Sequence, residues 1–206
     1  MPTLNTDAIL WSEPLADKPL IVLLHGYGSD ERDLFSLRGH LPGAFTYAAV
    51  RAPLDPPFPM SGYSWYPIEG LESRDPAGVT AGAEALLEWI RSLGERRVGL
   101  VGFSQGGAVS LQAMRLDPER FDFVVNLSGY AAGGSAPGDS SLLTASVPVF
   151  WGRGSADQVI PQEAIDHTTQ WLPDHSKLVG RVYPGLGHAV SEQEIEDLAR
   201  FLEKQV

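Results

Sequence analysis

Short apolar runs recur along the chain, and glycine or proline closes each of them. The run Leu20–Leu24 (LIVLL) is apolar throughout and contains β-branched residues, which predicts a strand buried on both faces of a parallel sheet. The same pattern predicts five further strands. These are Thr46–Val50, Arg97–Val101, Phe121–Leu127, Val147–Trp151 and Leu178–Tyr183.

Segments with the helical spacing of apolar residues lie between these runs and predict helices. The last of them begins with a capping box, in which Ser191 accepts a hydrogen bond from the Glu194 backbone and the Glu194 side chain reaches back. The predicted helices are Asp33–Arg38, Ala77–Ser92, Gln105–Arg115, Gln162–Leu172 and Ser191–Glu203.

The alternation of strand and helix predicts a single α/β domain spanning residues 1–206. A mostly parallel central sheet would carry helices on both faces, and ligands would bind beyond the carboxyl ends of its strands. The segment Ala131–Ser141 is rich in glycine, serine and proline, so we expect a mobile surface loop there that carries no chemistry.

The formal net charge of -11 disfavours nucleic acid and anionic lipid as partners. The absence of cysteine excludes disulfides, thiolate zinc sites and a cysteine nucleophile, and it suits a reducing cytosol. Residues Met1–Leu10 lack the basic and apolar regions of a signal peptide, and no apolar stretch approaches the roughly 20 residues that cross a bilayer. We therefore expect a cytoplasmic protein without membrane insertion.

The pentapeptide Gly102–Gly106 (GFSQG) fits the G-x-S-x-G nucleophile elbow, a strained turn that exposes a serine between a strand and a helix. Chance alone would supply roughly 0.2 such matches in this composition, so the context must support it. A predicted strand precedes Ser104 and a predicted helix follows it, with glycines on both sides where backbone would pass close. An alternative is that Ser104 only caps the following helix.

A serine hydroxyl needs a base to take its proton and an acid to hold that base in one tautomer. In this fold class the chain order is serine, acid, histidine. Of the three histidines after Ser104, His167 falls within a predicted helix and His175 in a polar turn, which favours surface positions. His188 follows the last strand through a compact loop, at the carboxyl edge where Ser104 is expected, and it is the predicted base.

The predicted acid is Asp157, which follows the strand Val147–Trp151 and lies between Ser104 and His188 in the sequence. An alternative is that Asp157 only caps the next helix. Two backbone donors would stabilise the oxyanion of the tetrahedral intermediate. We expect them to be the N–H of Gln105 and the N–H of Tyr27 in the glycine-rich turn after the first strong strand, with His25 structural.

Four motifs in this order resemble the phospholipase/carboxylesterase family of α/β-hydrolases, which is related to acyl-protein thioesterases. The resemblance implies the α/β-hydrolase fold without a large cap domain, the triad Ser104, Asp157 and His188, and the oxyanion donors Tyr27 and Gln105. The motifs are LLHGYGSDERDL (Leu23–Leu34), GFSQGG (Gly102–Gly107), GSADQVIP (Gly154–Pro161) and GLGHAVS (Gly185–Ser191).

The family places a Trp-aromatic pair beside the acyl pocket, and Trp65 and Tyr66 resemble it within the apolar stretch Pro56–Pro67. We expect Trp65, Tyr66 and Met60 to contact substrate, with Leu71–Val79 contributing to the same wall. The alternative is that these aromatic side chains only pack the loop onto the sheet.

The predicted function is a serine carboxylesterase that needs no cofactor or metal and acts on small-molecule esters of short to medium acyl chain. After His25-Gly26 this chain carries Tyr27-Gly28-Ser29-Asp30 where animal thioesterase-like members have GLGD or GMGD, and the SDERDL continuation resembles bacterial esterases. Open alternatives are an acyl thioesterase or lysophospholipase, peptide or lactone hydrolysis on the same triad, and a non-catalytic binding domain of the same fold. The resemblance is also compatible with a homodimer.

Overall fold

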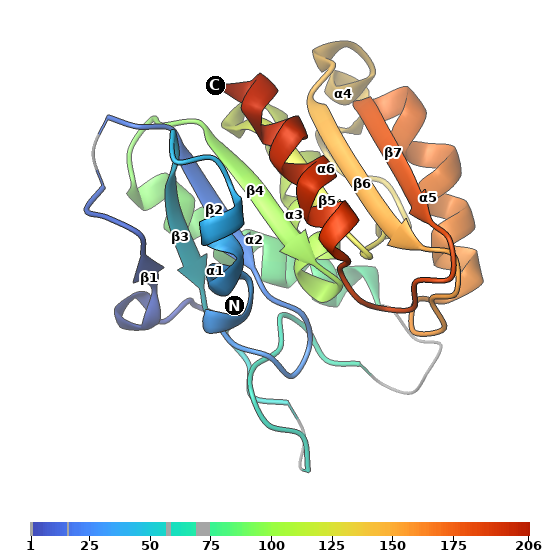
Figure 1. The fold of residues 1–206 in the computed structure, drawn as a ribbon, viewed down its shortest axis with the longest axis horizontal. Helices are drawn as coiled ribbons and strands as arrows, with labels where there is room; N and C mark the ends of the chain where they lie inside the picture. Colours follow the sequence, from blue (N-terminus) through green and yellow to red (C-terminus); the bar gives the residue numbers. More distant parts are fainter. Residues whose placement is uncertain (1, 16, 57–58, 69–74) are drawn as a thin grey trace.

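The computed structural model describes residues 2–15, 17–56, 59–68 and 75–206. Within these residues, seven strands form one sheet in the order β1-β3-β2-β4-β5-β6-β7 (Figure 1). Six of them are parallel, and β1 pairs antiparallel with β3 at one edge. The strands are β1 Leu10–Trp11, β2 Leu20–Leu24, β3 Thr46–Val50, β4 Val98–Phe103, β5 Phe121–Leu127, β6 Pro148–Gly154 and β7 Lys177–Tyr183.

Helices cover both faces of the sheet, as the alternation of elements predicts (Figure 1). Side chains of α2, α3, α4 and α5 pack on one face, and side chains of α1 and α6 pack on the other. No helix in the described ranges is long and apolar enough to cross a membrane. The α-helices are α1 Arg32–Phe35, α2 Pro76–Ser92, α3 Gln105–Leu116, α4 Asp139–Ala145, α5 Gln162–His175 and α6 Glu192–Leu202, with 3-10 turns at Thr6–Ala8, Ser36–His40, Pro118–Arg120 and Glu203–Gln205.

All six predicted strands are present. Five of them are mostly buried apolar runs, whereas β7 is an edge strand that is largely exposed. The sequence pattern missed β1, whose two residues are too short for any periodicity and depend on pairing with β3. It also placed His175 in a turn, whereas α5 continues through Pro173 to His175. The predicted helix Asp33–Arg38 is instead a short α1 followed by a 3-10 turn.

The expected mobile loop Ala131–Ser141 is wrong in two respects. Ala131 and Ala132 are buried, and α4 begins at Asp139. The buried guanidinium of Arg115 organises the segment: it donates to the carbonyl oxygens of Ala132 and Gly134 (2.6 Å each) and to both carboxylate oxygens of Asp139 (2.8 Å each). Because Arg115 lies in α3, outside the segment, the sequence of residues 131–141 alone could not predict that this segment is held in place.

The start of α6 carries half of the predicted capping box. Ser191 Oγ accepts a hydrogen bond from the Glu194 N–H (3.2 Å). The Glu194 carboxyl is 0% exposed, packs against Gly152 of β6, and has no hydrogen bond of normal geometry within the described residues. Burial raises the pKa of Glu194 from its ordinary 4.5 to about 7, and the nearby Ser191 N–H and Asp197 act less strongly and in opposite directions.

This buried carboxyl makes stability depend on pH. Between about pH 4.5 and 7 the unfolded chain has lost the Glu194 proton while the folded protein still holds it, so rising pH lowers the free energy of unfolding across that window. We expect Glu194→Gln, which stays neutral, to be more stable than the wild type at pH 8 by up to about 3 kcal/mol. Urea unfolding of both proteins at pH 5 and pH 8 measures this, and an advantage that does not grow with pH would contradict it.

Candidate active site

Ser104 lies at the tip of a sharp turn between β4 and α3. Its backbone has a φ of 54°, a left-handed conformation that costs a non-glycine residue energy. Glycines are required on both sides of the turn: a Cβ at Gly102 would lie 2.2 Å from the Gly106 carbonyl oxygen, and a Cβ at Gly106 would lie 2.1 Å from the Leu24 carbonyl oxygen. The turn therefore has the close packing and strain that a nucleophile elbow requires.

The structure brings Ser104, His188 and Asp157 into one hydrogen-bonded chain. His188 Nε2 lies 2.9 Å from Ser104 Oγ, and His188 Nδ1 lies 2.7 Å from Asp157 Oδ2. The imidazole also packs on the ring of Phe103, with 5.0 Å between ring centroids. In this geometry the imidazole can take the hydroxyl proton on one nitrogen while the carboxylate orients the other nitrogen.

Asp157 also holds its own turn. Its Oδ1 accepts from the N–H groups of Val159 (2.8 Å) and Ile160 (3.2 Å), while Oδ2 faces His188. One carboxylate oxygen of Asp157 therefore caps the turn, and the other is the partner of His188. Because the side chain is only 2% exposed, few waters compete for either oxygen.

The turn that carries Tyr27 is braced from two directions. Gly28 and Ser29 exchange backbone hydrogen bonds with Tyr63 (2.9 and 2.8 Å). Arg51 forms a two-pronged ion pair with Glu31 (2.8 and 2.7 Å), and this hydrogen bonding lowers the pKa of Glu31. Tyr27 and Gln105 line the pocket that contains Ser104, where both expected oxyanion donors belong.

His25 is structural, as expected. It is buried beneath the Tyr27 turn, with Nδ1 2.7 Å from the Gly26 carbonyl oxygen and Nε2 accepting from the Ala52 N–H (3.0 Å). Nδ1 therefore carries the proton, and burial lowers the pKa of His25. The ring joins the turn to the chain that leaves β3.

The two rejected histidines lie on α5, away from the chain of hydrogen bonds. His175 stacks on Trp171, with 4.2 Å between ring centroids, and His167 lines a separate pocket. Neither faces Ser104. In the described part of the chain, no group of three or more His, Asp or Glu side chains is arranged to hold a metal ion.

A pocket of about 290 Å³ surrounds Ser104, and its walls differ in character. Its lining includes the aromatic side chains of Tyr66 and Tyr130 as well as Ser29 and Asp33, which are hydrogen-bonded to each other (2.8 Å). The complete lining is Gly26, Tyr27, Ser29, Asp33, Tyr66, Ile68, Phe103, Ser104, Gln105, Tyr130, Val159, Ile160 and His188.

Of the three expected substrate contacts, the structure supports only Tyr66. Trp65 is 0% exposed and does not line the pocket, because its indole N–H is used to donate to the His25 carbonyl oxygen (2.9 Å). Met60 is 50% exposed and lies against Gly28 at the outer edge of the site. Residues 57–58 of the aromatic stretch and residues 71–74 of the expected second wall lie outside the described residues.

Gln105 was expected to act only through its backbone N–H, but its side chain has a role of its own. The buried amide accepts from the Trp65 N–H (2.9 Å) and donates to the Tyr66 carbonyl oxygen (2.8 Å). It therefore makes the two backbone hydrogen bonds that a neighbouring strand would otherwise make to the loop through Trp65 and Tyr66, here called the aromatic loop. Tyr130 was also missed as a pocket residue. Its position three residues after the end of β5, at the carboxyl edge of the sheet, is the signal that could have identified it.

Comparisons with known proteins identify the family. The family model described as Phospholipase/Carboxylesterase matches residues 5–206. Acyl-protein thioesterase 1 of Cryptococcus neoformans is 28% identical over 219 residues, covering 88% of this chain and 90% of that protein.

Solved structures are similar over nearly the whole chain. The crystal structure of esterase PE8 has a TM-score of 0.77 and 27% identity, covering 100% of this chain and 99% of that one. Acyl-protein thioesterase 2 of Zea mays has a TM-score of 0.78 and 21% identity, covering 96% of this chain and 98% of that one. At this identity the similarity shows the fold alone. The fold is that of the α/β-hydrolases.

Proposed function

The chain belongs to the phospholipase/carboxylesterase family and is an ester-hydrolysing enzyme, and from that premise we propose that it is a serine carboxylesterase acting on short to medium acyl chains. The observation that carries the proposal is the chain of hydrogen bonds from Ser104 through His188 to Asp157. The proposed substrate is a small-molecule carboxylic ester.

Catalysis proceeds in two halves. Ser104 Oγ attacks the ester carbonyl while His188 takes its proton, and the N–H groups of Tyr27 and Gln105 receive the oxyanion. His188 then gives the proton to the departing alcohol, which leaves the acyl group on Ser104. A water molecule, deprotonated by His188, attacks this acyl-enzyme and releases the acid with Ser104 restored.

The limited size of the pocket supports the acyl range. About 290 Å³ is available around Ser104, and Tyr66 and Tyr130 close one side of it. A long chain has little apolar surface to cover within that space, so it gains little of the free energy that burial of each methylene supplies.

The prediction is tested with p-nitrophenyl esters from acetate to palmitate. We expect kcat/KM to be highest between butyrate and octanoate and to fall roughly tenfold or more by palmitate, because methylenes beyond the pocket remain in water. A kcat/KM that rises steadily to palmitate would refute the proposed acyl range.

The relative named acyl-protein thioesterase favours one alternative, hydrolysis of acyl thioesters. Palmitoyl-CoA and butyryl-CoA, assayed beside the oxygen esters, separate the two functions. A kcat/KM for palmitoyl-CoA well above that for every oxygen ester would favour the thioesterase.

A further inference from the structure

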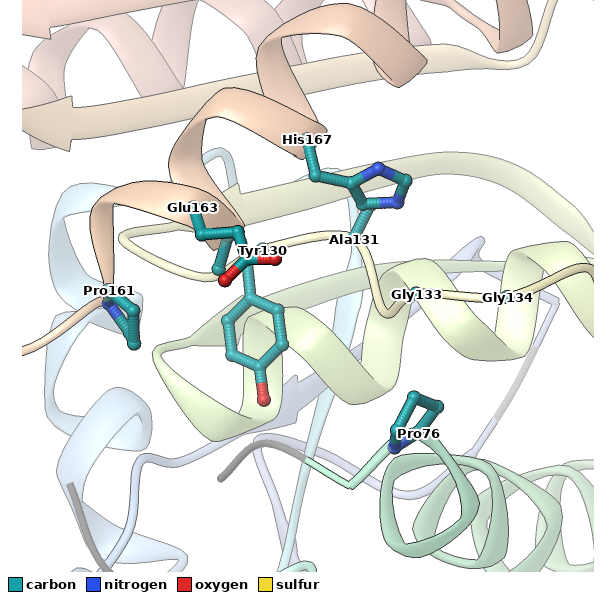
Figure 2. Close-up of a pocket in the computed structure, with 9 residues that line it drawn as sticks. Pro76, Tyr130, Ala131, Gly133, Gly134, Pro161, Glu163 and His167 are labelled. Atoms are coloured by element: carbon teal, nitrogen blue, oxygen red, sulfur yellow. The ribbon is translucent and has the colours of Figure 1, made fainter. Parts of the chain in front are cut away.

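A second pocket adjoins the one that contains Ser104. It measures about 410 Å³ and opens between the start of α5, the chain after β5 and the start of α2 (Figure 2). Tyr130 lines both pockets, and Ile160 of the first directly precedes Pro161 of the second. The two spaces therefore meet at the Tyr130 side chain.

Tyr130 is held firmly at this boundary. Its side chain is 3% exposed, and its hydroxyl lies 2.8 Å from the hydroxyl of Tyr66, which is 1% exposed. Figure 2 shows the Tyr130 ring between Pro161 and Pro76. A buried ring whose hydroxyl is hydrogen-bonded cannot swing aside without breaking that bond inside the protein.

The arrangement around Ser104 favours the Tyr130 side of the pocket for the acyl group of an ester. His188 must reach the departing alcohol oxygen, and its ring packs on Phe103, which belongs to the core under α1 and α6. Tyr66 and Tyr130 belong to the core under α2, α3 and α5. An alcohol that receives its proton from His188 would leave on the Phe103 side, and the acyl group would then extend toward the tyrosines.

We propose that Tyr130, fixed by Tyr66, is a specificity-determining residue that ends the acyl site and keeps longer chains out of the second pocket. This rests on the proposed esterase function. The second pocket could hold an acyl chain once Tyr130 is removed, because Pro76, Ala131 and Ala164 give it apolar wall. Glu163 also lines the second pocket, but it is exposed, so its carboxylate can remain in water.

The test compares kcat/KM for p-nitrophenyl laurate and butyrate in wild type and Tyr130→Ala. Removal of the ring joins the two pockets, and each newly buried methylene improves relative binding roughly fourfold. We therefore expect the laurate-to-butyrate ratio to rise roughly tenfold or more. Tyr130→Phe keeps the ring but loses the hydrogen bond to Tyr66, so its laurate-to-butyrate ratio should lie between those of the wild type and Tyr130→Ala.

An unchanged ratio in a folded Tyr130→Ala protein, verified by circular dichroism, would overturn the proposal. If that variant fails to fold, Tyr130→Leu retains a core contact while shortening the side chain, and the same ratio decides. The wild-type profile tests the esterase function separately: a wild type that prefers laurate refutes the proposed acyl range, whereas the effect of the substitution on the ratio decides the role of Tyr130.

Discussion

Replacing Ser104 with alanine is expected to lower kcat for p-nitrophenyl butyrate by roughly four to six orders of magnitude. The substitution removes the oxygen that His188 faces at 2.9 Å, so no covalent intermediate can form. Folding should be little affected, because the side-chain hydroxyl makes no other hydrogen bond within the described residues and alanine has almost the same size.

The measurement pairs initial rates with intact mass after treatment with a fluorophosphonate. The wild type should gain one probe adduct and lose activity, and Ser104→Ala should gain none. Ser141→Ala, on the exposed surface of α4, is the matched control and should behave as the wild type. Substantial turnover by Ser104→Ala, purified in parallel with an empty-vector control, would refute the assignment of the nucleophile.

Replacing Asp157 with asparagine is expected to lower kcat roughly 10⁴-fold while leaving KM within a few-fold of the wild type. An amide at this position can present its NH₂ group to His188 Nδ1 and thereby stabilise the tautomer that cannot accept the Ser104 proton. The amide oxygen can still accept from the Val159 and Ile160 N–H groups, so the turn should keep its conformation.

The control here is Asp174→Asn, on the exposed end of α5, for which we expect wild-type kinetics. Thermal unfolding of both variants separates a loss of chemistry from a loss of structure. If Asp157→Asn kept wild-type kcat, the carboxylate would be only a turn cap.

The fold and the positions of the triad residues could be predicted from the sequence, because each depends on residues that are near one another in the chain. Apolar runs predicted the strands of a sheet covered on both faces. Ser104, Asp157 and His188 follow β4, β6 and β7, which predicted that they lie at one edge of the sheet. Gly102 and Gly106, which flank Ser104, predicted close backbone contacts, and the structure contains them.

The features that the sequence missed depend on partners far along the chain. The composition of residues 131–141 resembles a flexible loop, yet Arg115 in α3 fixes the segment through four hydrogen bonds. The orientation of Trp65 was decided by a carbonyl oxygen of His25, 40 residues earlier. The burial of Glu194 depends on the space left by Gly152 on β6, which no helical pattern encodes.

The double use of Gln105 has a consequence for how this site can change over evolution. Its backbone N–H belongs to the proposed oxyanion site, while its amide side chain replaces a hydrogen-bonding neighbour for the loop through Trp65 and Tyr66. A buried amide that loses its partners costs about 1–3 kcal/mol per group. The aromatic loop therefore cannot be exchanged independently of Gln105. A loop transplanted from a relative would function here only if its backbone made the same two hydrogen bonds to the Gln105 side chain. Changes in substrate preference are thereby coupled to the proposed oxyanion site.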